Sequence, residues 1–287
     1  MVYCFYSDNA SIISIPMKLS IITINYNNVD GLRKTINSVI SQTFRDFEWI
    51  VIDGGSTDGS KDLINQYVEY FSYSISEPDS GVYNAMNKGI KQSKGEWLLF
   101  LNSGDALYDA HVLEKVFIDT PCADIIYGNY LMSNGILRIP EKEDNITLFY
   151  FFRGTIPHSG GSFIKKELFN KYGLYDESLK IISDWKWFMQ VVGFEGARIK
   201  KIELTLSLFD TSGMSSTMIY EKEEEGEKVI KNIIPKRIYK DYLNYRRFVD
   251  LAIEKENAIR HSWSYRIGHF LLFPSRFAKK IKSLLTK

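Results

Sequence analysis

Short runs of β-branched and other apolar residues alternate with segments of helical periodicity along the first part of the chain. Leu19–Asn25 is one such run, and Leu32, Ile36, Val39 and Ile40 follow it at helical spacing. Further strands are predicted at Trp49–Ile52, Tyr73–Ser76, Glu96–Leu101, Ile125–Tyr127 and, irregularly, Thr155–Phe163. Further helices are predicted after a Ser60 cap, over Val82–Gln92, from near Asp109 and over Asp184–Val192. This alternation predicts an α/β fold with a mostly parallel, doubly wound sheet.

The alternation loosens after about residue 120, and from Tyr220 onward the sequence is charged and helical in pattern. We therefore expect a main domain over residues 17–216 and a helical C-terminal appendage over residues 217–287. Residues 1–16 precede Met17 and are expected to be an extension that takes no part in the chemistry. A chain of 287 residues with 45% apolar residues is long enough for one main core.

Charge and cysteine content narrow the class of protein. The chain has 36 basic and 35 acidic residues, so it lacks the overall positive charge that gathers nucleic acid. Cys4 and Cys122 lie far apart without metal-ligand spacing, which favours a reducing cytoplasm. No stretch approaches the roughly 18 to 20 apolar residues of a membrane span, and no signal peptide is recognisable. We expect a cytoplasmic protein that is neither secreted nor transmembrane.

Polar residues gather where three of the predicted strands end. They are Asn25–Asn28, Asp53 and Asn102–Asp105. Because ligands of parallel α/β sheets bind beyond the carboxyl ends of the strands, these clusters should converge on one crevice.

Three aspartates are candidates for chemistry, each with a structural alternative. Asp53 opens a glycine-rich turn and could accept hydrogen bonds from a ligand, or serve the turn alone. Asp105 could hold a divalent cation that bridges nucleotide phosphates, or cap a helix. Asp184 lies next to Trp185 and near Trp187; burial against aromatic rings raises a carboxyl pKa and suits a general base, whereas a helix N-cap is the alternative.

The order of five motifs distinguishes between these alternatives. The motifs are Ser20–Asn27, Ser41–Phe44, Val51–Gly59, Gly95–Asp105 and Ser183–Trp185. Together they resemble glycosyltransferase family 2, a family of inverting enzymes with the GT-A fold, over about residues 18–215. Asp79–Ile90 and Asn102–Asp105 are similar to the branch that contains O-antigen and capsule assembly enzymes.

The resemblance implies roles for individual residues. Asn25, Tyr26 and Asp53 are expected to hold the nucleoside, and Asn102 is grouped with these nucleotide-sugar-binding residues. Asp105 is expected to reach the metal and diphosphate, with Mn2+ or Mg2+ as cofactor, and Asp184 is expected to be the catalytic base.

Three positions depart from the usual family pattern. Gly54 follows Asp53 where a second aspartate is common, and Asn102-Ser-Gly-Asp105 replaces an Asp-x-Asp-Asp pattern. Met86 stands where many relatives have an arginine near the nucleotide.

Two further segments have open interpretations. His158 matches a histidine common in the branch and is predicted to line the acceptor or donor-sugar pocket; a structural role is the alternative. Phe209–Ser215 has the glycine and hydroxyl content of a loop that closes over a diphosphate, or of a linker.

The end of the chain, Arg260–Lys287, contains seven Lys or Arg, no acidic residue and many large apolar side chains. This composition favours an interfacial anchor on anionic lipid; a helix packed on the catalytic domain is the alternative.

The sequence thus predicts an inverting glycosyltransferase of hexosyltransferase type (EC 2.4), peripheral at the inner face of the cell membrane. It would move a sugar, with a UDP-sugar as preferred donor, to a lipid-linked saccharide during O-antigen or capsule synthesis. The rival hypotheses are a sugar-nucleotide pyrophosphorylase and a non-catalytic, membrane-docked scaffold. Asn25–Asn28 lacks the basic glycine-rich loop that the former needs, and Asp184 opposes the latter.

Overall fold

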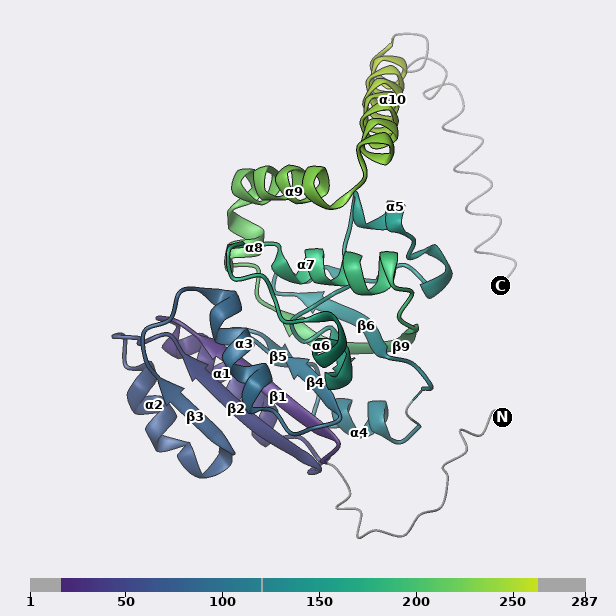
Figure 1. Cartoon of the computed structure of the whole chain (residues 1–287). Helices are drawn as coiled ribbons and strands as arrows, with labels where there is room; N and C mark the ends of the chain where they lie inside the picture. The colour runs from purple at the N-terminus through teal and green to yellow at the C-terminus, as the bar shows by residue number, and fades with distance from the viewer. Residues whose placement is uncertain (1–16, 120, 263–287) are drawn as a thin grey trace, which may run out of the picture. The chain divides into compact units, whose positions relative to one another are not determined.

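The computed structural model of the protein describes residues 17–119 and 121–262 (Figure 1). Contacts divide the chain into two compact units, Met1–Glu225 and Gly226–Lys287. The predicted extension, residues 1–16, lies outside the described residues, as do residues 263–287 of the predicted membrane anchor.

A single mixed sheet forms the centre of the first unit. Its strands are β1 (Leu19–Asn25), β2 (Phe47–Asp53), β3 (Tyr73–Ser76), β4 (Trp97–Phe100), β5 (Ala106–Leu107), β6 (Ile125–Met132), β7 (Leu137–Arg138), β8 (Ser162–Lys165) and β9 (Ile199–Phe209). The order is β3-β2-β1-β4-β8-β6-β9-β5, with β7 paired to β6. The first four strands in this order are parallel, whereas β8 runs antiparallel to β4 and to β6. The predicted α/β fold with a mostly parallel sheet is confirmed.

Short helices connect and cover the strands. They are α1 (Val29–Ile40), α2 (Ser60–Gln66), α3 (Val82–Gln92), α4 (Val112–Phe117), α5 (Leu148–Phe151), α6 (Lys166–Tyr172), α7 (Ser183–Phe188) and α8 (Met214–Thr217). Three-residue 3-10 turns lie at Val68–Tyr70 and Glu143–Asn145, and a π-helical segment, Met189–Phe194, extends α7.

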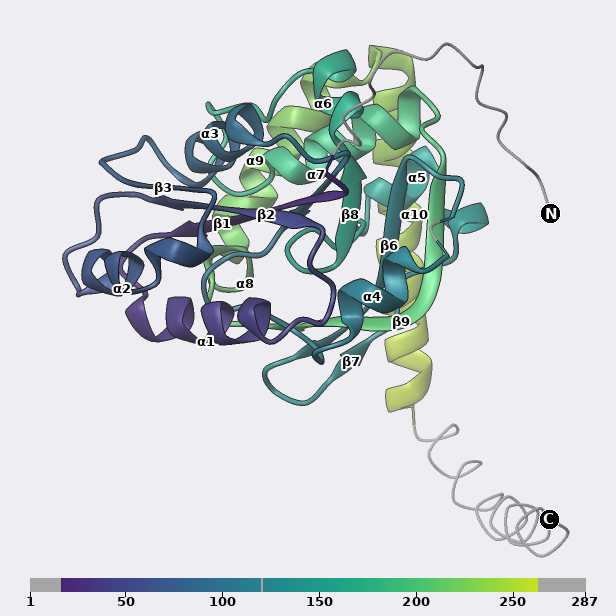
Figure 2. The same ribbon diagram turned by 90° about the horizontal axis from the view of Figure 1, so that it is seen from below.

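Helices lie on both faces of the parallel strands, as a doubly wound sheet requires (Figure 2). On one face, α1, α2 and α4 bury their apolar side chains against one side of β1, β2 and β4. On the other, α3 packs so closely that a side chain at Gly89 would collide with Ile22, since its Cβ would lie 2.4 Å from Ile22 Cγ2. The fully buried Phe100 of β4 contacts Phe169 of α6 on that face, with ring centroids 6.1 Å apart.

The structure corrects several predicted element boundaries. Gly59, not Ser60, is the N-cap of α2, and the Ser60 hydroxyl instead donates to Asp58. The helix predicted from near Asp109 begins at Val112. The irregular strand predicted over Thr155–Phe163 is confined to β8, because the preceding residues form a turn.

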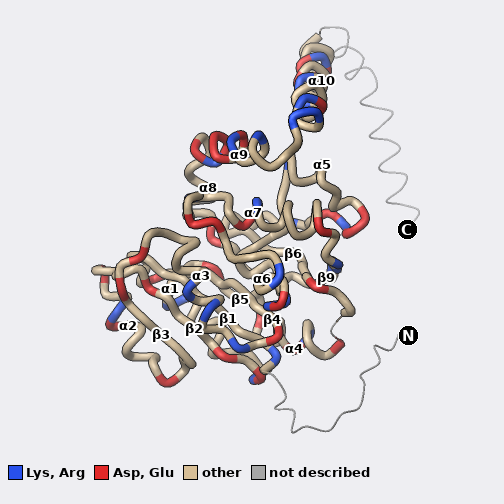
Figure 3. Tube along the Cα trace, in the orientation of Figure 1, with Lys and Arg blue, Asp and Glu red and all other residues tan. Residues whose placement is uncertain are grey.

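The described part of the second unit, up to residue 262, is helical, in agreement with the charged pattern after Tyr220. Helix α9 (Ile219–Ile233) spans the boundary between the units, and α10 (Lys236–His261) follows Pro235. Acidic residues predominate in the first turns of α9, whereas basic and acidic side chains are mixed along α10 (Figure 3). Within residues 17–119 and 121–262, no helix is both long and apolar enough to cross a membrane.

Candidate active site

The carboxyl ends of β1 and β2 meet at the predicted crevice. Asn25 and Asp53 are register partners in the parallel pair, and the Asn25 amide Nδ2 donates to Asp53 Oδ1 at 2.7 Å. The Asn25 side chain is 4% exposed, and its Oδ1 atom has no hydrogen-bond partner among the described residues. The structure therefore brings the first two polar clusters into direct contact.

Asp53 is completely buried and is surrounded by donors from the protein. Besides Asn25, its carboxylate accepts the Ser56 hydroxyl at 2.6 Å, the Ser56 backbone N–H at 3.0 Å and the Ser76 hydroxyl at 2.6 Å. Burial acts to raise the pKa of Asp53, but these hydrogen bonds outweigh it and lower the pKa. Four hydrogen bonds occupy the acceptor sites of a carboxylate, so Asp53 shapes the strand-end loop here. Its direct contact with a nucleoside stays a prediction.

Tyr26 and Asp79 face the same small space above Gly54. A Cβ atom at Gly54 would lie 2.7 Å from Asp79 Oδ2 and 3.1 Å from Tyr26 Cδ2, so a larger residue would displace these side chains. Asp79 Oδ1 accepts the Gly81 backbone N–H at 2.9 Å, which turns Oδ2 toward Gly54. Tyr26 is 68% exposed and offers a ring face to a ligand. Asp79 thus places a carboxylate oxygen next to Gly54, where many relatives have a second aspartate.

Helix α1 joins the β1 loop to the third polar cluster. Asn28, which caps α1, donates its amide to the Ser103 carbonyl at 3.2 Å. About two turns later, the Thr35 hydroxyl donates to the Asp105 carbonyl at 2.6 Å, and Lys34 Nζ reaches the Gly104 carbonyl at 2.8 Å. These bonds hold the Asn102–Asp105 turn against the first two clusters.

Asp105 is a buried carboxylate at the centre of this turn. It is 4% exposed, and it accepts the Ser159 hydroxyl on Oδ2 and the Asp210 backbone N–H on Oδ1, the latter at 2.8 Å. Burial raises the pKa of Asp105 to about 7, although the hydrogen bonds from Ser159 and Asp210 oppose the rise. Asp105 does not cap the following helix, which begins at Val112. Nearby, the buried Oδ1 atom of Asn102 has no hydrogen-bond partner among the described residues.

Asp184 lies in the first turn of α7. The indole of Trp185 donates to the Phe151 carbonyl and that of Trp187 to the Gly173 carbonyl, so neither indole N–H donates to the carboxylate. Instead, the Tyr83 hydroxyl donates to Asp184 Oδ1 at 2.7 Å. The N-cap of α7 is Ile182, so the alternative role of Asp184 as a cap is wrong.

His158 connects the region around Asp184 with the region around Asp105. Its ring stacks on Phe100 with centroids 4.7 Å apart, and its Nε2 atom lies 2.7 Å from the Tyr175 hydroxyl. Burial lowers the pKa of His158, and the charge of Asp184 partly opposes this effect. The next residue, Ser159, is the one that donates to Asp105. A lining role for His158 in a sugar pocket stays a prediction.

The predicted loop Phe209–Ser215 leaves β9 beside Asp105. Asp210 accepts the Ser212 backbone N–H and hydroxyl at 2.9 Å each, and α8 follows directly. Ser133 and Thr211 are joined by a 2.7 Å hydrogen bond. The segment thus forms a hydrogen-bonded turn next to Asp105, and its closure over a diphosphate stays a prediction.

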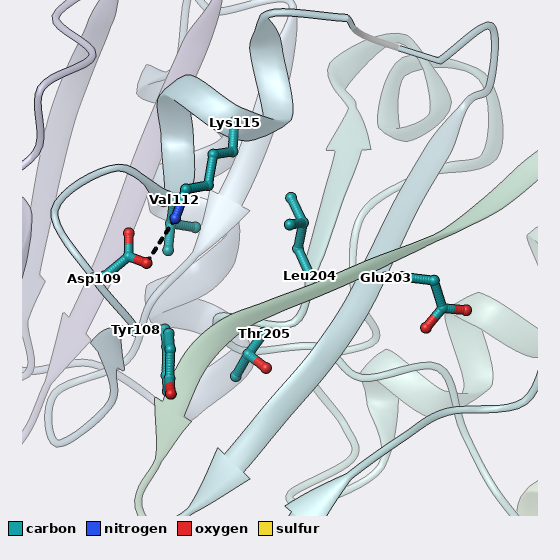
Figure 4. A pocket seen from close by; sticks show the side chains of 7 residues that line it. All are labelled: Tyr108, Asp109, Val112, Lys115, Glu203, Leu204 and Thr205. Atoms are coloured by element: carbon teal, nitrogen blue, oxygen red, sulfur yellow. Dashed lines mark hydrogen bonds and ion pairs between the residues drawn. The ribbon is translucent and has the colours of Figure 1, made fainter.

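A surface pocket lies elsewhere, between α4 and the middle of β9 (Figure 4). It is lined by residues that include Tyr108, Thr205 and the ion pair of Lys115 with Asp109, at 2.8 Å. None of the predicted site residues lines it, so the strand-end crevice remains the candidate site.

Comparison with known proteins identifies the family of the chain. Residues 20–179 match the family model described as "Glycosyl transferase family 2". The chain belongs to glycosyltransferase family 2. The glycosyltransferase is 30% identical over 210 residues to a PGL/p-HBAD biosynthesis glycosyltransferase of Mycobacterium bovis, covering 71% of this chain and 81% of the relative. It is 32% identical over 204 residues to an uncharacterised glycosyltransferase of Mycobacterium tuberculosis, covering 69% and 77%.

Solved structures share the GT-A fold of this glycosyltransferase. S. aureus TarS 1-349 in complex with UDP superimposes with a TM-score of 0.57 at 23% identity, over 68% of this chain and 60% of that fragment. A mannosyltransferase of Pyrobaculum calidifontis, in complex with GDP-Man and Mn2+, gives a TM-score of 0.60 at 13% identity, over 96% and 89%. The predictions of family and fold are confirmed, and the O-antigen branch stays a prediction.

Several residues of the crevice were absent from the sequence-based set. Asp79 and Tyr83 belong to a motif that indicated the branch without suggesting a role for either side chain. Ser159 follows His158 directly, and Asp210 lies in the predicted loop. Met86, the third departure from the family pattern, is 2% exposed and packs in the core of the domain.

Proposed function

We propose that this glycosyltransferase inverts the anomeric configuration of a nucleotide sugar in a single displacement. The observation that supports this proposal most directly is the placement of Asp184. Its carboxylate is partly buried, Tyr83 holds Oδ1, and Oδ2 makes no hydrogen bond with the described residues. A fixed carboxylate with one oxygen unoccupied suits a general base.

In the proposed step, Asp184 removes the proton from an acceptor hydroxyl as its oxygen attacks the anomeric carbon. A carbon–oxygen bond forms on one face of the sugar, and the bond to the diphosphate breaks on the other. The nucleoside diphosphate leaves with the electron pair, and Asp184 keeps the proton.

The donor would lie across the ends of β1 and β2. Tyr26 offers an exposed ring for the base of the nucleotide, while Asn25 Oδ1 and Asp79 Oδ2 are acceptors for the N–H and O–H groups of a nucleoside. TarS structures in complex with UDP and with UDP-GlcNAc support a UDP-sugar as the donor.

A divalent cation, Mn2+ or Mg2+, fits the chemistry of the Asn102–Asp105 turn. The orphaned Asn102 Oδ1 and the Asp105 carboxylate are oxygen ligands of the kind these ions prefer, and Asp210 lies beside them. Among the described residues, no three His, Cys, Asp or Glu side chains form a metal site by themselves. Diphosphate oxygens and water would therefore complete the coordination. Bound there, the cation would stabilise the charge of the departing diphosphate.

A lipid-linked saccharide is the proposed acceptor, in O-antigen or capsule synthesis at the inner face of the membrane. The support is the sequence of Arg260–Lys287, whose seven cations and aromatic residues suit an anionic lipid surface. The hexosyl nature of the transferred group rests on the family pattern.

Transfer assays with a panel of nucleotide sugars and Asp184→Asn test the proposal. The variant should bind donor nucleotide normally and turn over about 10²- to 10⁴-fold more slowly, the usual effect of removing a positioned base. The exposed Asp119→Asn variant is the matched control. Near-normal turnover of Asp184→Asn would exclude Asp184 as the base, and a wild-type protein without transferase activity would favour the scaffold hypothesis.

A further inference from the structure

A side-chain hydrogen bond between Tyr83 and Asp184 joins helix α3 to helix α7. These residues are 101 positions apart in the sequence. Tyr83 is 4% exposed, and its ring lies against Tyr175 with centroids 5.7 Å apart. The Tyr83 ring is thus buried, and its hydroxyl contacts the partly exposed carboxylate of Asp184.

The protonation and the direction of the Tyr83 hydroxyl are both fixed. Burial, followed by the negative charge of Asp184, raises the pKa of Tyr83 well above its ordinary value, so the phenol remains a donor. The hydroxyl donates to Asp184 Oδ1 at 2.7 Å, which directs its proton at that oxygen.

Further contacts fix α3 relative to the segment that leads into α7. Asn87, 2% exposed, donates its amide to the Tyr175 carbonyl at 2.9 Å and accepts the Tyr175 backbone N–H at 3.0 Å. The Glu177 carboxylate accepts the amides of Asn87 at 2.8 Å and Asn84 at 2.7 Å. The Ser183 hydroxyl in turn accepts the Asp176 backbone N–H at 2.6 Å. These bonds fix the position of Tyr83 relative to the start of α7.

We infer that Tyr83 is a positioning residue that holds Oδ1 of Asp184 so that Oδ2 faces the acceptor hydroxyl. This inference rests on the proposed role of Asp184 as the base. A carboxylate at a partly exposed position has two side-chain torsions and would otherwise sample several orientations. The charge-assisted hydrogen bond restricts it to one of them.

Steady-state kinetics of Tyr83→Phe test this role, since the substitution removes only the hydroxyl. The turnover number kcat should fall about 10- to 100-fold, the range expected when a charged group loses a hydrogen bond. The KM values for donor and acceptor should stay within about twofold, because the hydroxyl contacts neither substrate. The matched control is Tyr127→Phe. Tyr127 is buried like Tyr83, and its hydroxyl donates to the Glu141 carbonyl at 2.8 Å. This variant should lose a similar amount of stability while keeping kcat.

A double-mutant comparison separates this inference from the proposed function. In an Asp184→Asn background, adding Tyr83→Phe should leave the residual turnover unchanged, because no base remains to be positioned. Wild-type kcat in Tyr83→Phe with an inactive Asp184→Asn would overturn the positioning role alone. An equal loss of kcat in both backgrounds would also overturn it. If Tyr83→Phe lost nucleotide binding together with turnover, the hydroxyl would be supporting the fold and the inference would be wrong.

Discussion

Replacement of Asp105 by asparagine should change how the stability of the protein depends on pH. Asp105 is 4% exposed, and burial raises its pKa from 3.8 in the unfolded chain to about 7 in the folded protein. The folded state therefore holds the proton more tightly than the unfolded state. The contribution of Asp105 is fully favourable below pH 3.8 and is lost as the pH rises through about 7.

The magnitude follows from the difference between the two pKa values. A rise from 3.8 to about 7, at 1.36 kcal/mol per pH unit, corresponds to about 4 kcal/mol. In Asp105→Asn, the amide oxygen can still accept the Asp210 N–H, and the new NH2 group can donate to the Ser159 hydroxyl. The variant thus keeps the local hydrogen bonds but cannot ionise.

Denaturant unfolding between pH 5 and pH 8, with divalent cations removed by a chelator, measures this effect. The free energy of unfolding of the wild type minus that of Asp105→Asn should fall by about 3 kcal/mol across the range, because only the two pH units from pH 5 to the folded pKa of about 7 contribute. Taking the difference between the two proteins cancels the contribution of His158 to the free energy of unfolding. The lowered pKa of His158 makes stability rise with pH in the same window. Asp119→Asn, at an exposed position, should track the wild type. A difference that is the same at pH 5 and pH 8 would refute a desolvated Asp105.

Two further predictions concern the donor and the membrane. Asp79→Asn should weaken UDP binding in calorimetry about tenfold, because Oδ2 faces the proposed nucleoside position. Asp62→Asn, at an exposed position of α2, should leave the affinity for UDP unchanged. Equal affinities of the two variants for UDP would remove Asp79 from the pocket. Deletion of Arg260–Lys287 should abolish sedimentation with anionic vesicles, since each cation near the lipid surface contributes about 1 kcal/mol to binding. The deletion should leave transfer to a short soluble acceptor intact. Full-length protein that stays in the supernatant at low salt would contradict the anchor.

The sequence by itself determined the parallel half of the fold. The strands at Leu19–Asn25 and Tyr73–Ser76 and the helix at Val82–Gln92 coincide with their predicted bounds. Apolar periodicity reports which face of an element is buried, and this depends on neighbours close in the chain. The meeting of Asn25 with Asp53 follows as well, since parallel strands end at the same edge of a sheet.

The antiparallel strands were decided by tertiary structure. Regular alternation of strand and helix ceases after about residue 120, and β8 returns to pair with β4 and β6 in the opposite direction. No local pattern specifies that pairing, because it depends on which strand edge is still available when the chain returns.

The environment of each site residue was likewise decided only by contacts between distant segments. The motifs identified Asp53, Asp105 and Asp184 as candidates. They did not reveal that protein donors occupy all acceptor sites of Asp53, or that Asp105 is shielded from solvent. The indoles of the tryptophans next to Asp184 in sequence bind backbone carbonyls elsewhere, and the hydrogen bond to its carboxylate comes from Tyr83 on a distant helix. Adjacent residues on a helix point in different directions, so the partner of a catalytic carboxylate is set by the packing of one helix against another.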